Sequence, residues 1–153
     1  MARLKIDKEE MMPVDGPRPF DLEGWIATAQ FEDLVGLVID MAADGRAELR
    51  VPFRVKLSQG GGVMHGGALT TLADTAVAMA IKSLLPEGTI FATTELNTTF
   101  LAPVKSGWVR AVADVSRGEG RNFVGKADVF DDQEVLVARF NSNFRVARGQ
   151  GFD

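Results

Sequence analysis

The chain of 153 residues contains no cysteine and only one histidine, His65. Without cysteine it has no disulfide, no thiol nucleophile and no thiolate ligand for a metal ion. With a single histidine it cannot build a metal site from several imidazole groups. These absences exclude disulfide scaffolds, cysteine hydrolases and histidine-rich metalloenzymes.

Long apolar runs are also missing. A membrane-spanning helix needs about 20 apolar residues in succession, and the most apolar stretch, residues 63–85, is interrupted by Asp74 and Lys82. The first ten residues are charged and do not resemble a secretory signal. The net charge of −4 does not favour a nucleic-acid surface. We therefore expect a cytoplasmic protein without a membrane or nucleic-acid partner.

The amino-acid composition suits one globular domain, because 46% of the residues are hydrophobic. We expect an N-terminal arm and short helix over residues 1–30, followed by a single domain over residues 31–153. The arm should be loose over residues 1–18, and the helix should lie near residues 19–33. The tail after Ala147 is expected to be frayed.

The spacing of apolar residues in the domain predicts strands, one long helix and then more strands. The helix is expected over residues 66–85, because its apolar positions recur at helical spacing and cover nearly its whole surface. The expected strands cover residues 34–42, 47–53, 90–101, 108–116, 122–130 and 134–146. Asp44-Gly45 predicts a tight hairpin turn between the first two strands.

A helix that is apolar on most faces should be buried on most faces. A curved antiparallel sheet wrapped around one long central helix satisfies this requirement. The predicted fold class is therefore α+β, in the hotdog arrangement.

The candidate chemistry lies in the run Gln59-Gly60-Gly61-Gly62-Val63-Met64-His65-Gly66-Gly67 and in Asp74. This pattern resembles the hotdog thioesterases of the phenylacetate-degradation (PaaI-like) type. Those proteins have an amide residue, a glycine, His-Gly-Gly, and an acidic residue nine positions after the histidine. The resemblance continues through residues 94–104 and covers about residues 31–147. Most relatives carry Asn where Gln59 stands, so the preferred acyl group stays open.

Asp74 is the only acid between Gly66 and Leu85, and burying a carboxylate without partners is costly. One interpretation is a structural hydrogen bond to a threonine of the helix or to a neighbouring amide. The resemblance implies a catalytic role instead. Asp74 then acts either as a nucleophile, through a mixed anhydride, or as a general base on water.

Gly66 should begin the helix, where backbone N–H groups lack internal partners and carry partial positive charge. Its N–H would polarise a thioester carbonyl and stabilise the developing oxyanion. The absence of side chains at Gly66 and Gly67 would let a ligand approach. A tight turn that requires positive φ is the other reason for these glycines.

Three further residues are candidates for the catalytic site. His65 could be a base, but the resemblance implies that it orders the loop and the helix start. Gln59 either fixes the loop or positions the thioester or the water. By resemblance Thr93 is the candidate for holding the attacking water, and strand propensity is the alternative reason for a threonine there.

Arg117 and Arg121 flank a predicted hairpin loop, where they would also suit the phosphates of coenzyme A. The resemblance implies hydrolysis of acyl-coenzyme A to a free acid and coenzyme A, with coenzyme A as part of the substrate and no metal or other cofactor. It also implies a homodimer or dimer of dimers, with active sites at the subunit interface. The alternatives are a non-catalytic acyl-coenzyme A-binding protein and a hotdog enoyl-thioester hydratase.

Overall fold

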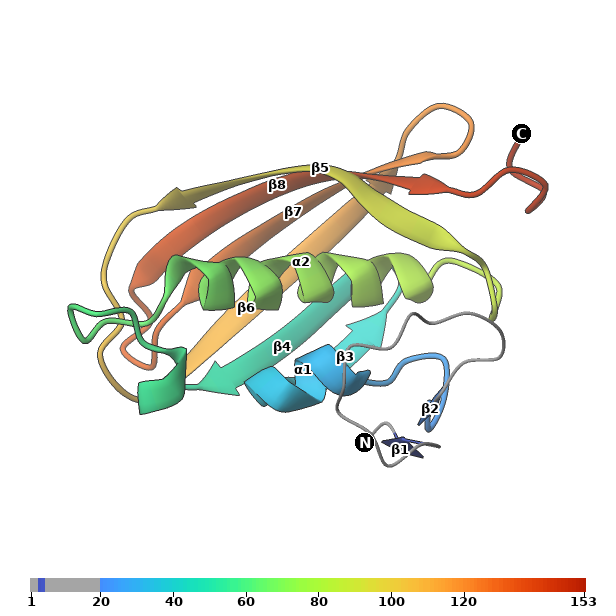
Figure 1. Ribbon diagram of the computed structural model, residues 1–153. Coiled ribbons are helices and arrows are strands. Elements are labelled where there is room, and N and C mark those ends of the chain that lie inside the picture. Colours follow the sequence, from blue (N-terminus) through green and yellow to red (C-terminus); the bar gives the residue numbers. More distant parts are fainter. Residues whose placement is uncertain (1–2, 5–19) are drawn as a thin grey trace.

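The computed structural model describes residues 3–4 and 20–153 (Figure 1). Its main feature is a curved antiparallel sheet of six strands, with the long helix α2 (Gly66–Lys82) lying across the concave face. The strands follow the spatial order β3-β4-β6-β7-β8-β5. Their bounds are β3 (Val38–Ala43), β4 (Arg46–Pro52), β5 (Phe91–Phe100), β6 (Trp108–Arg117), β7 (Asn122–Phe130) and β8 (Leu136–Val146). The predicted α+β hotdog fold is confirmed.

The N-terminal part differs from the sequence prediction. The helix expected over residues 19–33 is wrong for residues 20–29, which contain the short strand β2 (Phe20–Asp21), paired with β1 (Arg3–Leu4), and an irregular segment. Helix α1 covers only Gln30–Val35. It begins where the Ala29 N–H donates to the Glu32 carboxylate over 3.1 Å. The loose arm predicted for residues 1–18 lies almost entirely outside the described residues.

Gly36 explains why the first strand of the sheet begins later than predicted. Its φ of 88° closes α1 in the left-handed region, which glycine adopts without a steric penalty. The chain therefore leaves the helix at Gly36, and β3 starts at Val38. The following turn agrees with expectation, because Asp44 and Gly45 have φ values of 51° and 77°. Positive φ at both positions is typical of a tight hairpin turn.

The core lies between the sheet and α2. Strand β6 buries Val109, Ala111 and Ala113 on one face, as its alternating pattern predicts. Helix α2 is buried on most of its surface. A stripe along one side of the helix is less covered and includes Gly67, Thr71, Asp74, Ala78 and Lys82. This stripe places the acid of α2 at the boundary between the core and the open side of the sheet.

Gly125 of β7 allows α2 to approach the sheet closely. A Cβ atom at Gly125 would overlap Cγ1 of Val77 and would lie 3.0 Å from Oγ of Ser142. Val77 is fully buried, so it has little room to move away. The helix and the sheet can therefore keep this separation only with glycine at position 125.

We expect Gly125→Ala to lower the free energy of unfolding by about 1–3 kcal/mol, since overpacking a buried position forces neighbouring groups to shift. Urea denaturation measures the change. Gly60→Ala is the matched control, because a Cβ at Gly60 meets no atom within 4 Å. Adding Val77→Ala to Gly125→Ala should recover part of the loss. Wild-type stability of Gly125→Ala would contradict this account of the packing.

The tail that was expected to fray is instead anchored to the sheet. The side-chain oxygen of Gln150 accepts a hydrogen bond from the Ile90 N–H over 3.2 Å. Phe152 packs against Phe123 with ring centroids 6.4 Å apart. The prediction failed because these contacts join segments distant in sequence.

None of the helices in the described part of the chain has the length and apolar character that a membrane span requires.

Candidate active site

Asp74 lies in the middle of α2, and its carboxylate meets strand β5. The Thr93 hydroxyl donates a hydrogen bond to Oδ1 of Asp74 over 3.0 Å. Two of the alternative partners on the helix are engaged elsewhere: Thr70 pairs with Thr98, and the Thr71 hydroxyl donates to the Gly67 carbonyl. The acid is therefore held by a residue of the sheet.

The surroundings of Asp74 raise its pKa above the ordinary value. Burial is the largest cause, because it penalises the charged form. The hydrogen bond from Thr93 opposes this shift, and the nearby negative charge of Glu32 adds to it. A half-buried carboxylate with a raised pKa is suited to accept a proton or to attack an electrophile.

An irregularity in β5 orients Thr93. The pairing of β5 with β8 shifts register between Thr93 and Glu95, so Thr94 is an extra residue in the ladder. The Thr94 hydroxyl bonds to the Asn143 carbonyl over 3.1 Å, whereas Thr93 bonds to the acid of the helix. β-Bulges often reorient side chains next to functional sites. The structure thus places Thr93, rather than Thr94, toward α2.

His65 caps the start of α2. The imidazole Nδ1 of His65 accepts a hydrogen bond from the Gly67 N–H over 2.8 Å. The backbone N–H of His65 donates to the Leu57 carbonyl over 2.8 Å. A Cβ at Gly67 would lie 2.9 Å from Nδ1 of His65, so glycine leaves room for the cap. These contacts tie the loop before α2 to the helix start.

The N–H of Gly66 has no hydrogen-bond partner within the described part of the chain. The Phe100 ring at the end of β5 lies close above this residue, and a Cβ at Gly66 would come within 2.8 Å of it. A hollow of about 350 Å³ opens at the same helix start and is lined in part by His65, Gly67 and Thr71. The helix start therefore offers one N–H donor, at Gly66, and a hollow that the neighbouring His65 and Gly67 line.

Gln59 lies on the exposed loop that leads to this helix start. Its side-chain oxygen accepts from the Gly61 N–H, and its backbone N–H donates to the Val63 carbonyl over 2.8 Å. Gln59 thus stabilises the glycine-rich loop, which leads to His65 and to the helix start at Gly66. This arrangement fits a role of the Gln59 amide in fixing the loop.

The loop between β6 and β7, which Arg117 and Arg121 flank, lies at the far end of the sheet from the start of α2 (Figure 1). Both side chains contact the C-terminal tail. Arg121 donates to the Val146 carbonyl over 2.9 Å and pairs with Asp153 over 3.1 Å. Arg117 lies 5.3 Å from the centre of the Phe152 ring. Within one chain the two arginines therefore do not join the residues at the start of α2.

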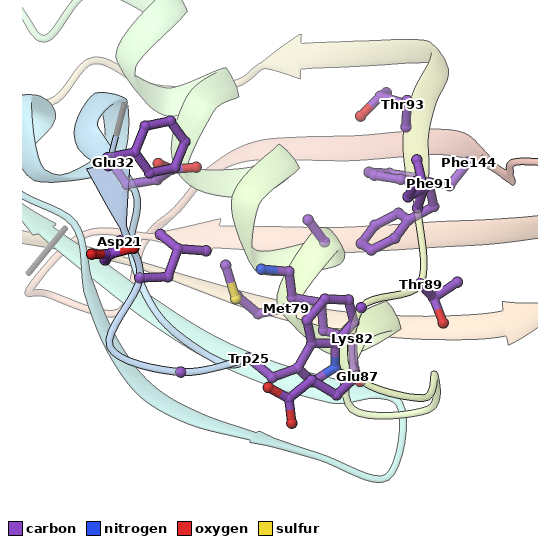
Figure 2. Close-up of a pocket in the computed structure, with 17 residues that line it drawn as sticks. Asp21, Trp25, Glu32, Met79, Lys82, Glu87, Thr89, Phe91, Thr93 and Phe144 are labelled. Atoms are coloured by element: carbon purple, nitrogen blue, oxygen red, sulfur yellow. Dashed lines mark hydrogen bonds between the residues drawn. The ribbon is translucent and has the colours of Figure 1, made fainter. Parts of the chain in front are cut away.

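A pocket of about 700 Å³ is lined by Thr93, the hydrogen-bond partner of Asp74, and by Glu32 (Figure 2). Figure 2 shows Glu32 on one side and Thr93 with Phe91 on the other. Sequence reasoning did not find Glu32 as a neighbour of Asp74. No sequence signal marked it, because the two residues lie on different helices and are 42 positions apart in sequence. No three acidic or histidine side chains among the described residues converge to hold a metal ion.

Comparison with known proteins defines the class to which this fold and site belong. The profile of the thioesterase superfamily matches residues 61–138, which include the helix start, Asp74 and Thr93. A Halobacterium salinarum protein that is named as an esterase is 33% identical over 124 residues, covering 74% of this chain and 82% of that protein. The chain belongs to the thioesterase superfamily.

Solved structures agree with this membership. A conserved protein from Pseudomonas aeruginosa superimposes with a TM-score of 0.74 at 34% identity, covering 78% of this chain and 95% of that chain. A mutant of the phenylacetic acid degradation protein PaaI from Thermus thermophilus superimposes with a TM-score of 0.70 at 25% identity. The match covers 76% of this chain and 98% of that chain. The relatives support a thioesterase-type hydrolase.

Proposed function

We propose that this protein hydrolyses acyl-coenzyme A thioesters and that Asp74 is the catalytic acid-base group or nucleophile. The observation that carries the proposal is the half-buried Asp74 carboxylate, held by Thr93 within the region matched to the thioesterase superfamily. The motif around His65 and the similarity to a PaaI structure support a phenylacetate-degradation-type enzyme. A cytoplasmic location remains a prediction.

In the proposed reaction the thioester carbonyl accepts a hydrogen bond from the Gly66 N–H. The positive end of the helix dipole then stabilises the negative charge that develops on the carbonyl oxygen. Asp74 either attacks the carbonyl carbon or removes a proton from the water that attacks it. Attack by Asp74 expels the coenzyme A thiolate and forms a mixed anhydride, which water then hydrolyses to the free acid and the restored carboxylate. In the general-base route water adds to the carbonyl carbon, and the thiolate leaves and takes up a proton. Thr93 holds Asp74 and stands where it can also hold the attacking water.

The Gly66 N–H and the Asp74 carboxylate cannot easily serve one thioester from the same helix. The two residues are eight positions apart on α2, which corresponds to about 12 Å along the helix axis. A reacting pair must approach to about 3.5 Å. We therefore propose sites shared between the subunits of a dimer, with Gly66 from one chain and Asp74 from the other.

The edge of the sheet supports association of two chains. Among the described strands, β5 pairs with β8 on one side only. Its neighbourhood also exposes Leu96, Phe100 and Leu101, which are 44%, 53% and 50% exposed. An open strand edge with apolar side chains is normally covered by another chain. A homodimer, alone or within a dimer of dimers, would cover it. In such an assembly Arg121, and with it Arg117, remain candidates for binding coenzyme A phosphates.

The direct test is a panel of acyl-coenzyme A substrates with detection of free thiol. Release of thiol that depends on Asp74 would support the proposal. Binding without turnover would instead favour an acyl-coenzyme A-binding protein, and hydration of an enoyl substrate without thiol release would favour a hydratase.

The raised pKa of Asp74 gives a prediction about pH. Only the deprotonated carboxylate can act, so kcat/KM should fall as the pH falls through the raised pKa. Thr93→Val removes the hydrogen bond that lowers this pKa, so the acid limb should move to higher pH. Glu32→Gln removes a charge that raises it, so the limb should move to lower pH. Profiles of kcat/KM against pH measure both shifts.

Thr93→Ser is the matched control for this experiment, because serine keeps the hydroxyl and should keep the acid limb near its wild-type position. Shifts in the same direction for Thr93→Val and Glu32→Gln would contradict the assignment of the limb to Asp74.

A further inference from the structure

We propose that the pocket beside Thr93 receives the acyl group of the thioester and that residues 20–32 select neutral, apolar acyl groups over those that carry a carboxylate. The inference rests on the proposed thioesterase function and adds the substrate class to it.

The position of the pocket connects it to the reacting centre. Thr93 lines the pocket and donates to the Asp74 carboxylate over 3.0 Å. Ala78 also lines it and follows Asp74 by one turn of α2. An acyl chain that extends away from a carbonyl carbon beside Asp74 therefore has this pocket directly in front of it.

Apolar and aromatic side chains from several elements line one part of the pocket, and polar groups line the rest. Trp25 comes from the N-terminal segment, Met79 from α2, Phe91 from β5 and Phe144 from β8. The Trp25 ring is fixed in place, because its N–H donates to the Lys82 carbonyl over 2.8 Å. A volume of about 700 Å³ is within the range of small-molecule sites. Each methylene buried here should favour binding by about fourfold.

Among the described residues, three carboxylates (Asp21, Glu32 and Glu87) and one ammonium group (Lys82) line the pocket (Figure 2). Asp21 and Lys82 both have interactions of their own, so the repulsion of a bound carboxylate rests on Glu32 and Glu87. Lys82 lies 4.9 Å from the centre of the Trp25 ring. A carboxylate at the end of an acyl chain would meet like charges here, and such repulsion rejects a competing ligand.

One wall of this pocket lies outside the stretch that matches the family profile. The match to the thioesterase superfamily begins at residue 61, so Phe91, Thr93 and Ala78 lie inside it. The segment from Phe20 to Glu32 lies before it. Residues outside the matched stretch therefore shape the far side of a pocket whose near side includes Thr93, the hydrogen-bond partner of Asp74. This is the expected place for a specificity element.

Gly24 provides the sharpest variant, because it lines the pocket and a Cβ there meets no atom within 4 Å. Gly24→Leu should fill part of the pocket without a clash. We expect the ratio of kcat/KM for hexanoyl-coenzyme A to that for acetyl-coenzyme A to fall about tenfold or more. The matched control is Ala27→Leu, which adds bulk to a second hollow that Gly24 also lines but not to the pocket itself, and should keep the ratio.

Glu32→Gln tests the charge selection. It should raise kcat/KM for adipoyl-coenzyme A relative to hexanoyl-coenzyme A by about threefold or more, since the two acyl chains have the same length and differ in the terminal carboxylate. A change in the pKa of Asp74 affects both substrates alike, so it cancels in this ratio. An unchanged ratio would overturn the selection by charge.

Binding separates this inference from the proposed function. Calorimetry with Asp74→Asn and with Asp74→Asn/Gly24→Leu compares hexanoyl- with acetyl-coenzyme A without requiring turnover. If hydrolysis depends on Asp74 but folded Gly24→Leu keeps the wild-type ratio, the acyl pocket is overturned and the thioesterase function stands. If no thioester is hydrolysed but the preference for hexanoyl-coenzyme A in binding depends on Gly24, the proposed function fails and the pocket stands.

Discussion

Asp74→Asn should abolish thioester hydrolysis while leaving the protein folded. The amide is nearly isosteric with the carboxylate, but it is a poor nucleophile and a poor base. Loss of a catalytic acid-base group typically costs about 10²–10⁴-fold in rate, and loss of a nucleophile costs at least as much. Steady-state rates of thiol release measure the effect.

The melting temperature provides the control for this variant. Burial raises the pKa of Asp74, so the folded state carries an unfavourable carboxylate at neutral pH. Replacing it with a neutral amide should keep the stability at or above that of the wild type. Near-wild-type turnover by a folded Asp74→Asn protein would refute the catalytic assignment.

Two inactive variants should restore activity when they are paired in one dimer. Gln59→Ala damages the helix-start half of the site, and Asp74→Asn damages the acid half. If Gly66 and Gln59 come from one chain and Asp74 from the other, a mixed dimer has one intact site and one site with both lesions. Co-expression in equal amounts makes half the dimers mixed, so activity should return to roughly a quarter of wild type.

The distance along α2 is the reason to expect this recovery. A site built within one chain would carry one lesion in every copy, so no mixture of the two variants would recover activity. Mass spectrometry confirms that mixed dimers are present. Mixed dimers that remain inactive would overturn the shared site without affecting the role of Asp74, which the single variant tests separately.

The sequence alone was sufficient for the class of fold. The apolar pattern of α2 required a cover on most of its faces, and the alternation along β6 showed which side of that strand would meet it. The turn at Asp44 and Gly45 could also be predicted, because the residues themselves determine which φ values are accessible. These features depend on periodicity and local sterics, which each segment carries within itself.

Local signals were less reliable at the N-terminal segment and the tail. Residues 20–29 have enough apolar positions to suggest a helix, yet they form β2 and an irregular wall of the pocket. The tail has no periodic pattern, yet Phe152 packs into the sheet. In both cases contacts with distant residues determine the conformation, and helix propensity is too weak to oppose them.

The candidate site also has residues that the sequence could identify and contacts that only the structure could reveal. The sequence identified Asp74, His65 and Gly66 as a motif, because their spacing along the chain is itself the signal. Only the tertiary structure decided that Thr93 holds the acid, since a bulge in β5 determines which threonine faces α2. It also placed Glu32 where its charge reaches Asp74 and set Phe100 above Gly66. These contacts join residues 19 to 42 positions apart in sequence, and only the tertiary fold brings them together.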